Sequence, residues 1–141
     1  MNHPRAALVL VALSLPFGAH AQALRWVEIA RGDDVAAFVD STSLRKAGGI
    51  AKVWLKWEND PPVPISNGSS KVYRSEKTLS IFNCKARSVA TVQVVRYSLP
   101  EGTGDIVESG SIPEAEAKHR EVVPDTMAEH VLNWVCMQSD Q

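Results

Sequence analysis

Short stretches rich in valine, isoleucine and aromatic residues alternate with turn-forming residues along most of the chain. A period of two within such a stretch indicates a strand, because successive side chains of a strand point to opposite faces of a sheet. The short connections favour hairpins, so we predict an antiparallel sheet. The pattern predicts about six strands, near residues 24–30, 35–40, 49–58, 71–84, 88–98 and 105–110.

The third stretch shows the clearest alternation. Val53, Leu55 and Trp57 occupy every second position and are predicted to face a core. The residues between them are predicted to face solvent: Lys52, Trp54 and Lys56. An outward tryptophan is a common hot spot for protein partners, so Trp54 is a candidate binding residue. The alternative is that the helix or a second layer covers this face and simply buries Trp54.

The fifth stretch has apolar side chains on both faces, which is typical of a central strand covered on both sides. Its alternation predicts Val92 and Val94 on one face, and on the other Val89, Val95 and Tyr97. Lys85-Ala86-Arg87 before it suits a hairpin turn, and residues 100–104, with two glycines and a proline, supply the turn after it.

One helix is predicted, at the C-terminus. Pro124 interrupts the preceding segment, and Thr126 with Glu129 matches the Ser/Thr-x-x-Glu capping box that begins many helices. Apolar residues then recur at spacings of three and four and form one stripe that must be buried. The stripe consists of Ala128, Val131, Leu132, Val135 and Cys136. The expected fold is therefore α+β, with an antiparallel sheet of about six strands packed by this helix.

The N-terminus has the pattern of an export signal. Arg5 gives a short positive region, residues 6–17 form an apolar stretch, and Ala19-His20-Ala21 is a cleavage motif. The stretch is shorter than the roughly 20 residues that span a bilayer, so no membrane anchor is expected after cleavage. We predict a signal peptide over residues 1–21 and one domain over residues 22–141, located in the periplasm or on the outer cell surface.

Export changes what the two cysteines mean. In an oxidising compartment Cys84 and Cys136 are predicted to form one disulfide, which leaves neither as a nucleophile. Cys136 lies on the buried stripe and Cys84 ends a strand, so the bridge would join the helix to the sheet.

Composition argues against several classes of function. The 15 Lys and Arg residues nearly balance 16 Asp and Glu, and no basic cluster longer than Arg45-Lys46 suggests a nucleic-acid partner. His119 and His130 lack the spacing of a zinc site, and Glu114 and Glu116 fit a solvated turn, with Glu114 near Lys118 if the turn is helical. We therefore predict no catalytic, cofactor-binding or metal site, and no enzyme.

Two further features suit protein binding. Residues 59–70 are rich in proline and small polar residues, a composition that suits either a recognition loop or an ordinary hairpin tip between two strands. Tyr73 and Arg74 follow and would extend the surface around Trp54 if the register of the strands places them on the same face.

The chain resembles the surface-adhesin protein E family of exported bacterial domains. The order and spacing of motifs along nearly the whole mature chain carry this resemblance. The motifs are Trp26, Phe38-Val39-Asp40-Ser41 with Leu44, Val53-Trp54, Tyr73-Arg74-Ser75 with Lys77, Asn83-Cys84 with Arg87, Tyr97-Ser98, Gly102-Thr103-Gly104, Pro124-x-Thr126 and Cys136. One departure is Asn83, where the family usually has aspartate.

The resemblance implies an antiparallel sheet with a C-terminal helix, a place in the cell envelope and, in the founding branch, adhesion to host extracellular-matrix proteins. We therefore expect non-covalent protein binding. The alternative is a periplasmic structural or accessory subunit that docks on an envelope complex. Open sheet edges would also permit a homodimer.

Overall fold

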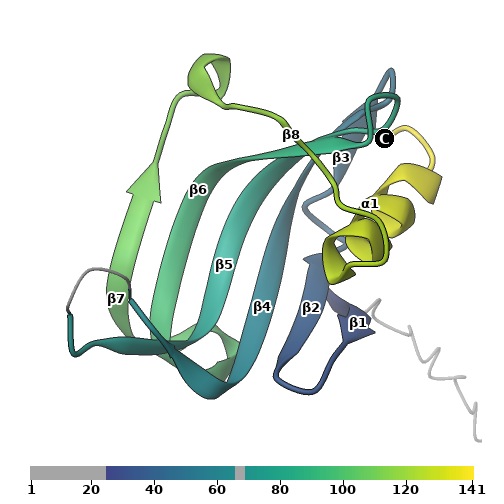
Figure 1. Cartoon of the computed structure of the whole chain (residues 1–141). Helices are drawn as coiled ribbons and strands as arrows, with labels where there is room; N and C mark the ends of the chain where they lie inside the picture. Colours follow the sequence, from purple (N-terminus) through teal and green to yellow (C-terminus); the bar gives the residue numbers. More distant parts are fainter. Residues whose placement is uncertain (1–24, 66–68) are drawn as a thin grey trace, which may run out of the picture.

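The computed structural model describes residues 25–65 and 69–141, so the predicted signal peptide lies outside the described residues. Six strands form the main antiparallel sheet in the order β1-β2-β4-β5-β6-β7, and a C-terminal helix, α1, packs on one face (Figure 1). The predicted fold class is confirmed. The bounds are β1 Trp26–Arg31, β2 Val35–Asp40, β4 Ile50–Pro64, β5 Val72–Asn83, β6 Ser88–Leu99, β7 Thr103–Ser111 and α1 Met127–Met137.

Two short strands were not predicted. β3, Arg45–Ala47, pairs with the start of β4, and β8, Arg120–Glu121, pairs with the start of β6. The β3–β4 hairpin turns through Gly48 and Gly49, whose φ angles of 57° and 81° are those that a two-residue turn needs and that glycine adopts without strain. Two single-turn 3₁₀ helices complete the described elements, η1 at Pro100–Gly102 and η2 at Glu114–Glu116.

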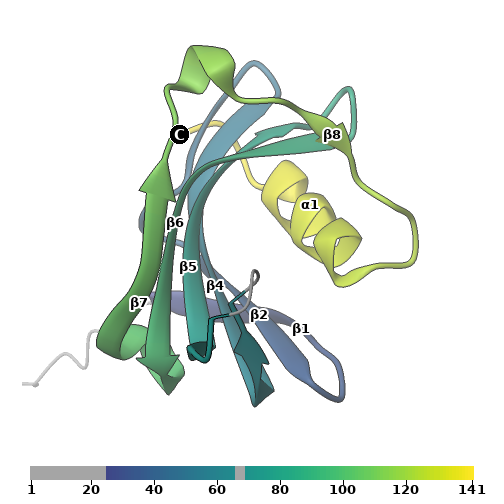
Figure 2. The same ribbon diagram turned by 60° about the vertical axis from the view of Figure 1, so that its left-hand side comes forward.

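The core lies between α1 and the face of the sheet that curves around it (Figure 2). The predicted helix stripe is confirmed in its central residues, because Val131, Leu132 and Val135 are buried. They pack on the inward residues of β2, β4 and β5, among them Val53 and Phe82. Burial of such side chains contributes about 1.5–3 kcal/mol each, so this contact contributes strongly to the stability of the domain.

The start of α1 is capped as the motif predicts, with one difference. The Thr126 hydroxyl accepts a hydrogen bond from the Glu129 amide at 3.3 Å. The Glu129 carboxylate accepts the bond from the amide of Asp125 at 2.9 Å rather than from the amide of Thr126. It also accepts a hydrogen bond from Arg87 in the β5–β6 turn, which ties the first turn of the helix to the sheet.

The end of α1 is held in two ways. Cys84, directly after β5, forms the predicted disulfide with Cys136 in the last turn of the helix. The Lys46 ammonium of β3 donates hydrogen bonds to the carbonyls of Cys136 and Gln138, at 2.7 Å and 2.5 Å. A cation is favourable there because the helix end carries unpaired carbonyls and partial negative charge. Lys46, one of the two residues of the basic pair Arg45-Lys46, therefore has a structural role.

The predicted faces of the β6 residues are wrong in part. A register shift between β5 and β6 pairs Ser80 with Thr91 but Leu79 with Gln93, so Val92 is an extra residue. The bulge reverses the alternation. Val89 therefore faces α1, whereas Val95 and Tyr97 face the other side of the sheet.

The proline-rich segment is also not wholly a loop. β4 continues to Pro64, and Val63 pairs with Tyr73 after a register shift that starts at Glu58. Pro61 and Pro62 lie where the pairing is interrupted, as is usual for proline in sheets, whereas Pro64 pairs with Val72 at the end of the strand. Residues 66–68 of the predicted tip lie outside the described residues.

Asp40, at the end of β2, is fully buried. Protonation of its carboxylate makes the stability of the domain depend on pH. Burial alone would raise its pKa, but hydrogen bonds from Thr42 and Arg25 outweigh it, so the pKa lies below its ordinary value. The stability that these bonds contribute is therefore complete above the ordinary value of about 3.9 and is lost as the pH falls through the folded-state pKa.

We expect the free energy of unfolding, measured by urea titration, to fall as the pH is lowered below about 4. In Asp40→Asn the protein should be less stable at neutral pH and should lose less between neutral and acidic pH. The same pH dependence in both proteins would contradict this role for Asp40.

Candidate functional site

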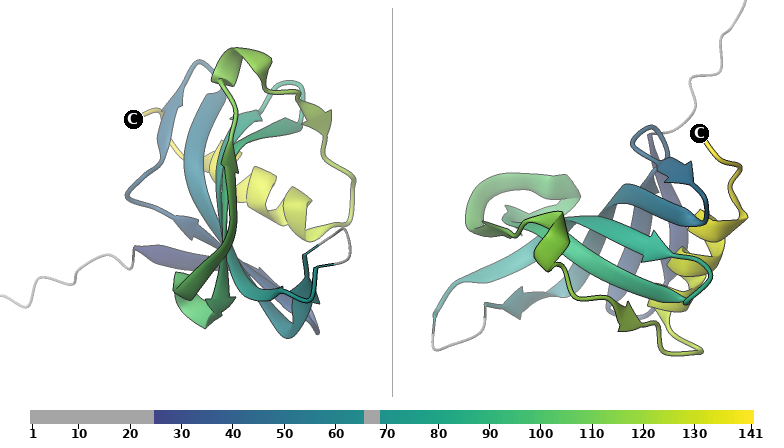
Figure 3. Two further views of the ribbon diagram at one scale, coloured as in Figure 1. Left: turned by 90° about the vertical axis from the view of Figure 1, so that its left-hand side faces the viewer. Right: turned by 90° about the horizontal axis from the view of Figure 1, so that it is seen from above.

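Trp54 lies on the face of the sheet that α1 leaves open. Val53, Leu55 and Trp57 contact the core, as predicted, so the alternation of β4 turns Trp54 to the opposite side. Figure 3 shows α1 on one side of the sheet only. Trp54 is half-buried, and its cover comes from neighbours on the sheet rather than from the helix. The alternative that the helix covers Trp54 is therefore wrong.

A groove of about 260 Å³ lies beside Trp54. Side chains of β1, β4, β5 and β6, together with Arg25 just before β1, line it. We name it the aromatic groove, and its residues are Arg25, Trp26, Trp54, Lys77, Val95 and Tyr97. Three aromatic rings and two cations thus lie together on an exposed sheet face. Tryptophan, tyrosine and arginine are the side chains most often found at the energetic centre of protein interfaces.

Lys77 is the polar centre of the groove. Its ammonium lies 5.0 Å from the ring centre of Tyr97 and 5.9 Å from that of Trp26, both within the range of cation–π attraction. Among the described residues it has no carboxylate partner, and its one hydrogen bond goes to the Gly102 carbonyl at 3.5 Å. A partner's carboxylate would therefore find an unpaired cation between two aromatic rings.

Lys56 stands directly opposite Lys77 across β4 and β5. Contrary to the prediction, Lys56 does not face solvent, because it is 1% exposed. Its ammonium forms ion pairs with Glu101 and with Glu58, the latter at 3.3 Å. It also lies 4.5 Å from the ring centre of Phe38. Like charges at directly paired positions of two strands repel each other. The carboxylates of Glu58 and Glu101 neutralise Lys56, so Lys56 and Lys77 can lie side by side on the sheet.

Gly102 permits this arrangement. Its φ of 66° suits glycine, and a Cβ atom placed on it would lie 2.2 Å from Cε of Lys77. The backbone of η1 can therefore approach the lysine closely only where residue 102 has no side chain.

Tyr73 and Arg74 do not line the aromatic groove. The Tyr73 ring stacks under the guanidinium of Arg96, 4.8 Å from its ring centre, and burial raises the pKa of its hydroxyl. Arg74 pairs with Asp60 at 2.8 Å and lines a separate, largely polar depression near the β1–β2 turn. The structure thus groups neither residue with Trp54.

The other titratable candidates lie apart. His119 contacts the Ser88 hydroxyl at 3.3 Å, and His130 lies exposed on α1. Glu114 and Glu116 form the exposed η2 turn, where Glu114 pairs with Lys52 rather than with Lys118. No group of three or more potential metal ligands occurs in residues 25–65 and 69–141. In the same ranges, no helix has the length and apolar character needed to cross a membrane.

Sequence reasoning found Trp54 but missed its neighbours as site residues. Trp26, Lys77 and Tyr97 come from three other strands, and only the register brings them together. A signal did exist, because all three are among the residues that carry the family resemblance.

Comparisons with known proteins agree with this architecture. The family model described as surface-adhesin protein E matches residues 26–137. Crystal form II of Haemophilus influenzae protein E has a similar structure, with 16% identity, a TM-score of 0.58 and coverage of 90% of this chain and 96% of that one. Protein E from non-typeable Haemophilus influenzae gives 17% identity, a TM-score of 0.54 and coverage of 89% and 82%. At this identity the two structures show a shared fold alone.

No curated protein sequence matches the chain significantly. The family model nevertheless spans β1 to the end of α1 and includes both cysteines and every residue of the aromatic groove except Arg25. The chain therefore belongs to the surface-adhesin protein E family, a family of adhesins rather than of enzymes.

Proposed function

We propose that this chain is an exported cell-envelope protein that binds another protein non-covalently through the aromatic groove. The observation that carries the proposal is the cluster of Trp26, Trp54 and Tyr97 around the unpaired ammonium of Lys77. Such a site would bury aromatic side chains of the groove against the partner, while Lys77 pairs with a partner carboxylate. Family membership supports a protein partner, and a host extracellular-matrix protein is the partner class that we propose.

Export is supported by the N-terminal signal pattern and by the disulfide, which is stable in oxidising compartments. The second candidate is an accessory subunit docked on a periplasmic complex. β1 and β7 form the two edges of the main sheet among the described residues, which favours this candidate because a sheet edge accepts a partner strand or a second copy of the chain. Protease or antibody access on intact cells separates these functions, since a surface adhesin would be reached and a periplasmic subunit would be shielded.

The groove is tested by Trp54→Ala in a binding assay against a panel of immobilised extracellular-matrix proteins. Loss of a central tryptophan costs about 2 kcal/mol or more, so we expect binding to weaken by about 30-fold or more. Tyr73→Ala is the matched control, because it removes an aromatic ring outside the groove. Equal losses in the two variants, or no loss in Trp54→Ala, would contradict the proposal.

A further inference from the structure

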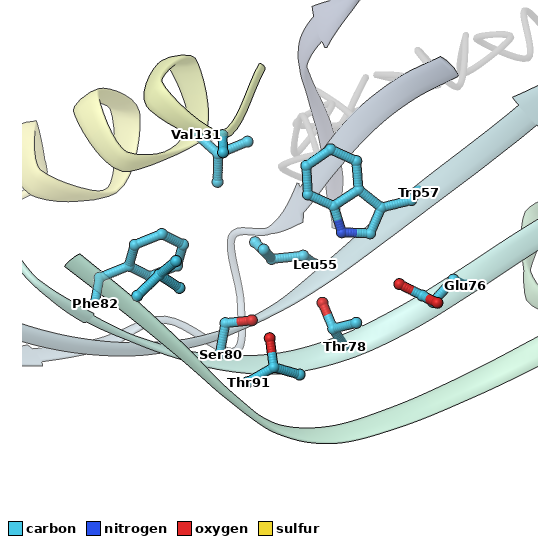
Figure 4. Close-up of a pocket in the computed structure, with 10 residues that line it drawn as sticks. Leu55, Trp57, Glu76, Thr78, Ser80, Phe82, Thr91 and Val131 are labelled. Carbon is cyan, nitrogen blue, oxygen red and sulfur yellow. The ribbon is translucent and has the colours of Figure 1, made fainter. Parts of the chain in front are cut away.

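A second cavity lies under α1, on the opposite face of the sheet from the aromatic groove. Its volume is about 250 Å³, and Figure 4 shows the side chains that line it, among them the exposed Thr91. Most of its wall is apolar and comes from β4, β5, β6 and α1. The apolar residues that matter here are Leu55, Trp57, Phe82, Val89 and Val131.

Three hydroxyl groups interrupt this apolar wall. Thr78 and Ser80 alternate along β5, and Thr91 of β6 is the cross-strand partner of Ser80. Figure 4 shows all three oxygen atoms directed into the space beneath Leu55 and Val131. Because the β6 bulge lies directly after Thr91, this residue shares a face with Ser80 while Gln93 does not.

These hydroxyls open into the cavity, because Thr91 is exposed and, among the described residues, the fully enclosed side-chain atom without a hydrogen-bond partner is Nε of Arg74. Ser80 is 1% exposed and Thr78 is 6% exposed. Within the described ranges, neither their side chains nor that of Thr91 forms a hydrogen bond with the protein. A hydroxyl that faces a cavity and has no partner in the protein forms its hydrogen bonds with water or with a ligand that displaces the water. The cavity therefore offers hydrogen bonds to a guest molecule at its floor.

Charge at the side of the cavity restricts the guest. Glu76 lines the cavity and accepts a hydrogen bond from Arg96 at 2.5 Å. Arg96 also pairs with Glu108, so two carboxylates share one guanidinium and the local charge is negative. An anionic group would be repelled here, and an apolar wall disfavours any ion.

Size restricts it further. A cavity of about 150 Å³ accommodates benzene, so 250 Å³ accommodates a bicyclic ring or one substituted ring. We propose that this cavity binds a small uncharged molecule that has a ring-sized apolar body and one hydrogen-bonding group directed at Thr78, Ser80 and Thr91. The site is independent of the aromatic groove because the two lie on opposite faces of the sheet.

The test compares 2-naphthol with 2-naphthoate as probes of the purified protein by amide NMR titration at pH 7. The two probes share the same rings, but the phenol is neutral at this pH and the carboxylate is charged. 2-Naphthol should give saturable shifts at the amides of Ser80 and Thr91 and at the indole of Trp57. 2-Naphthoate should bind at least about ten times more weakly, since it must carry its charge past Glu76 into an apolar space.

Three variants locate the site. Ser80→Ala should weaken 2-naphthol binding about five-fold, the effect of one lost hydrogen bond. Ala128→Leu fills the cavity from α1 and should abolish binding, whereas Trp54→Ala should leave it unchanged. The proposal is overturned if no saturable shift occurs at these residues, if 2-naphthoate binds as well as 2-naphthol, or if binding survives unchanged in both cavity variants. Thermal melts of each variant show whether it is folded.

Discussion

Replacing Cys84 and Cys136 together with alanine is expected to lower the melting temperature by on the order of 10–20 °C. The bridge closes a loop with a sequence separation of 52 residues. For that length the chain-entropy model gives about 4 kcal/mol of stabilisation. This is a large part of the roughly 5–15 kcal/mol that stabilises an ordinary domain.

The helix makes this loss severe. α1 has only 11 residues, and an isolated helix of that length is marginal in water. Its position on the sheet therefore depends on the core contacts at its centre and on the bridge at its end. Without the bridge, the last turn retains the buried Val135 and the hydrogen bonds from Lys46 and Gln138, but no covalent tie to the sheet.

Thermal unfolding by circular dichroism measures the effect. Met137→Ala, which truncates an exposed side chain in the same helical turn, is the control and should shift the midpoint little. Reduction of the wild-type protein should reproduce the midpoint of the double variant. A double variant that melts within about 2 °C of the wild type would contradict the stabilising role that the loop length predicts.

Lys56→Ala is expected to destabilise the domain by about 3 kcal/mol, because removing one partner of a buried ion pair leaves the other uncompensated. The substitution leaves Glu58, whose side chain is 16% exposed, without its cation. It also removes the side chain whose ammonium lies 4.5 Å from the ring centre of Phe38 and 5.5 Å from that of Trp26. Lys56 is the direct cross-strand partner of Lys77, so both losses occur next to the aromatic groove.

A second substitution separates the two losses. Lys56→Met keeps an apolar chain of similar length, so it should be less destabilising than Lys56→Ala. Lys52→Ala is the matched control on the same strand, since the Lys52 side chain is 41% exposed and its ion pair is with the exposed Glu114. It should change the free energy of unfolding by less than about 1 kcal/mol. Similar losses for Lys52→Ala and Lys56→Ala in urea titrations would contradict a special role for Lys56.

The predicted strands and helix were found because each carries a local signal of its own. Period-two alternation marks β4, and the capping motif with its apolar stripe marks α1. β3 and β8 have three and two residues, too few for any period, and each exists through pairing with a longer strand. No glycine, proline or other turn-forming residue marks the bulge at Val92. The alternation predicted for β6 was therefore correct only up to the bulge or only after it, because the bulge exchanges the two faces.

In the candidate site, too, one residue follows from a local pattern and its neighbours do not. The side of the sheet on which Trp54 lies follows from its parity with Val53 and Leu55, which the sequence shows directly. Its neighbours Trp26, Lys77 and Tyr97 depend on the register of four strands. A shift of one residue in that register would move any of them to the other face.

By itself, the sequence determined the antiparallel strands, the C-terminal helix, the cysteine pair and the family, because periodicity, capping and motif order are local properties of the chain. Only the tertiary structure decided that Lys56 is buried, that Trp54 lies in an aromatic groove, and that Ser80 and Thr91 share a cavity under α1. The physical reason is that alternation separates the two faces of a strand. What covers each face depends on residues far away in the chain, brought there by strand register, the bulge and the η1 turn.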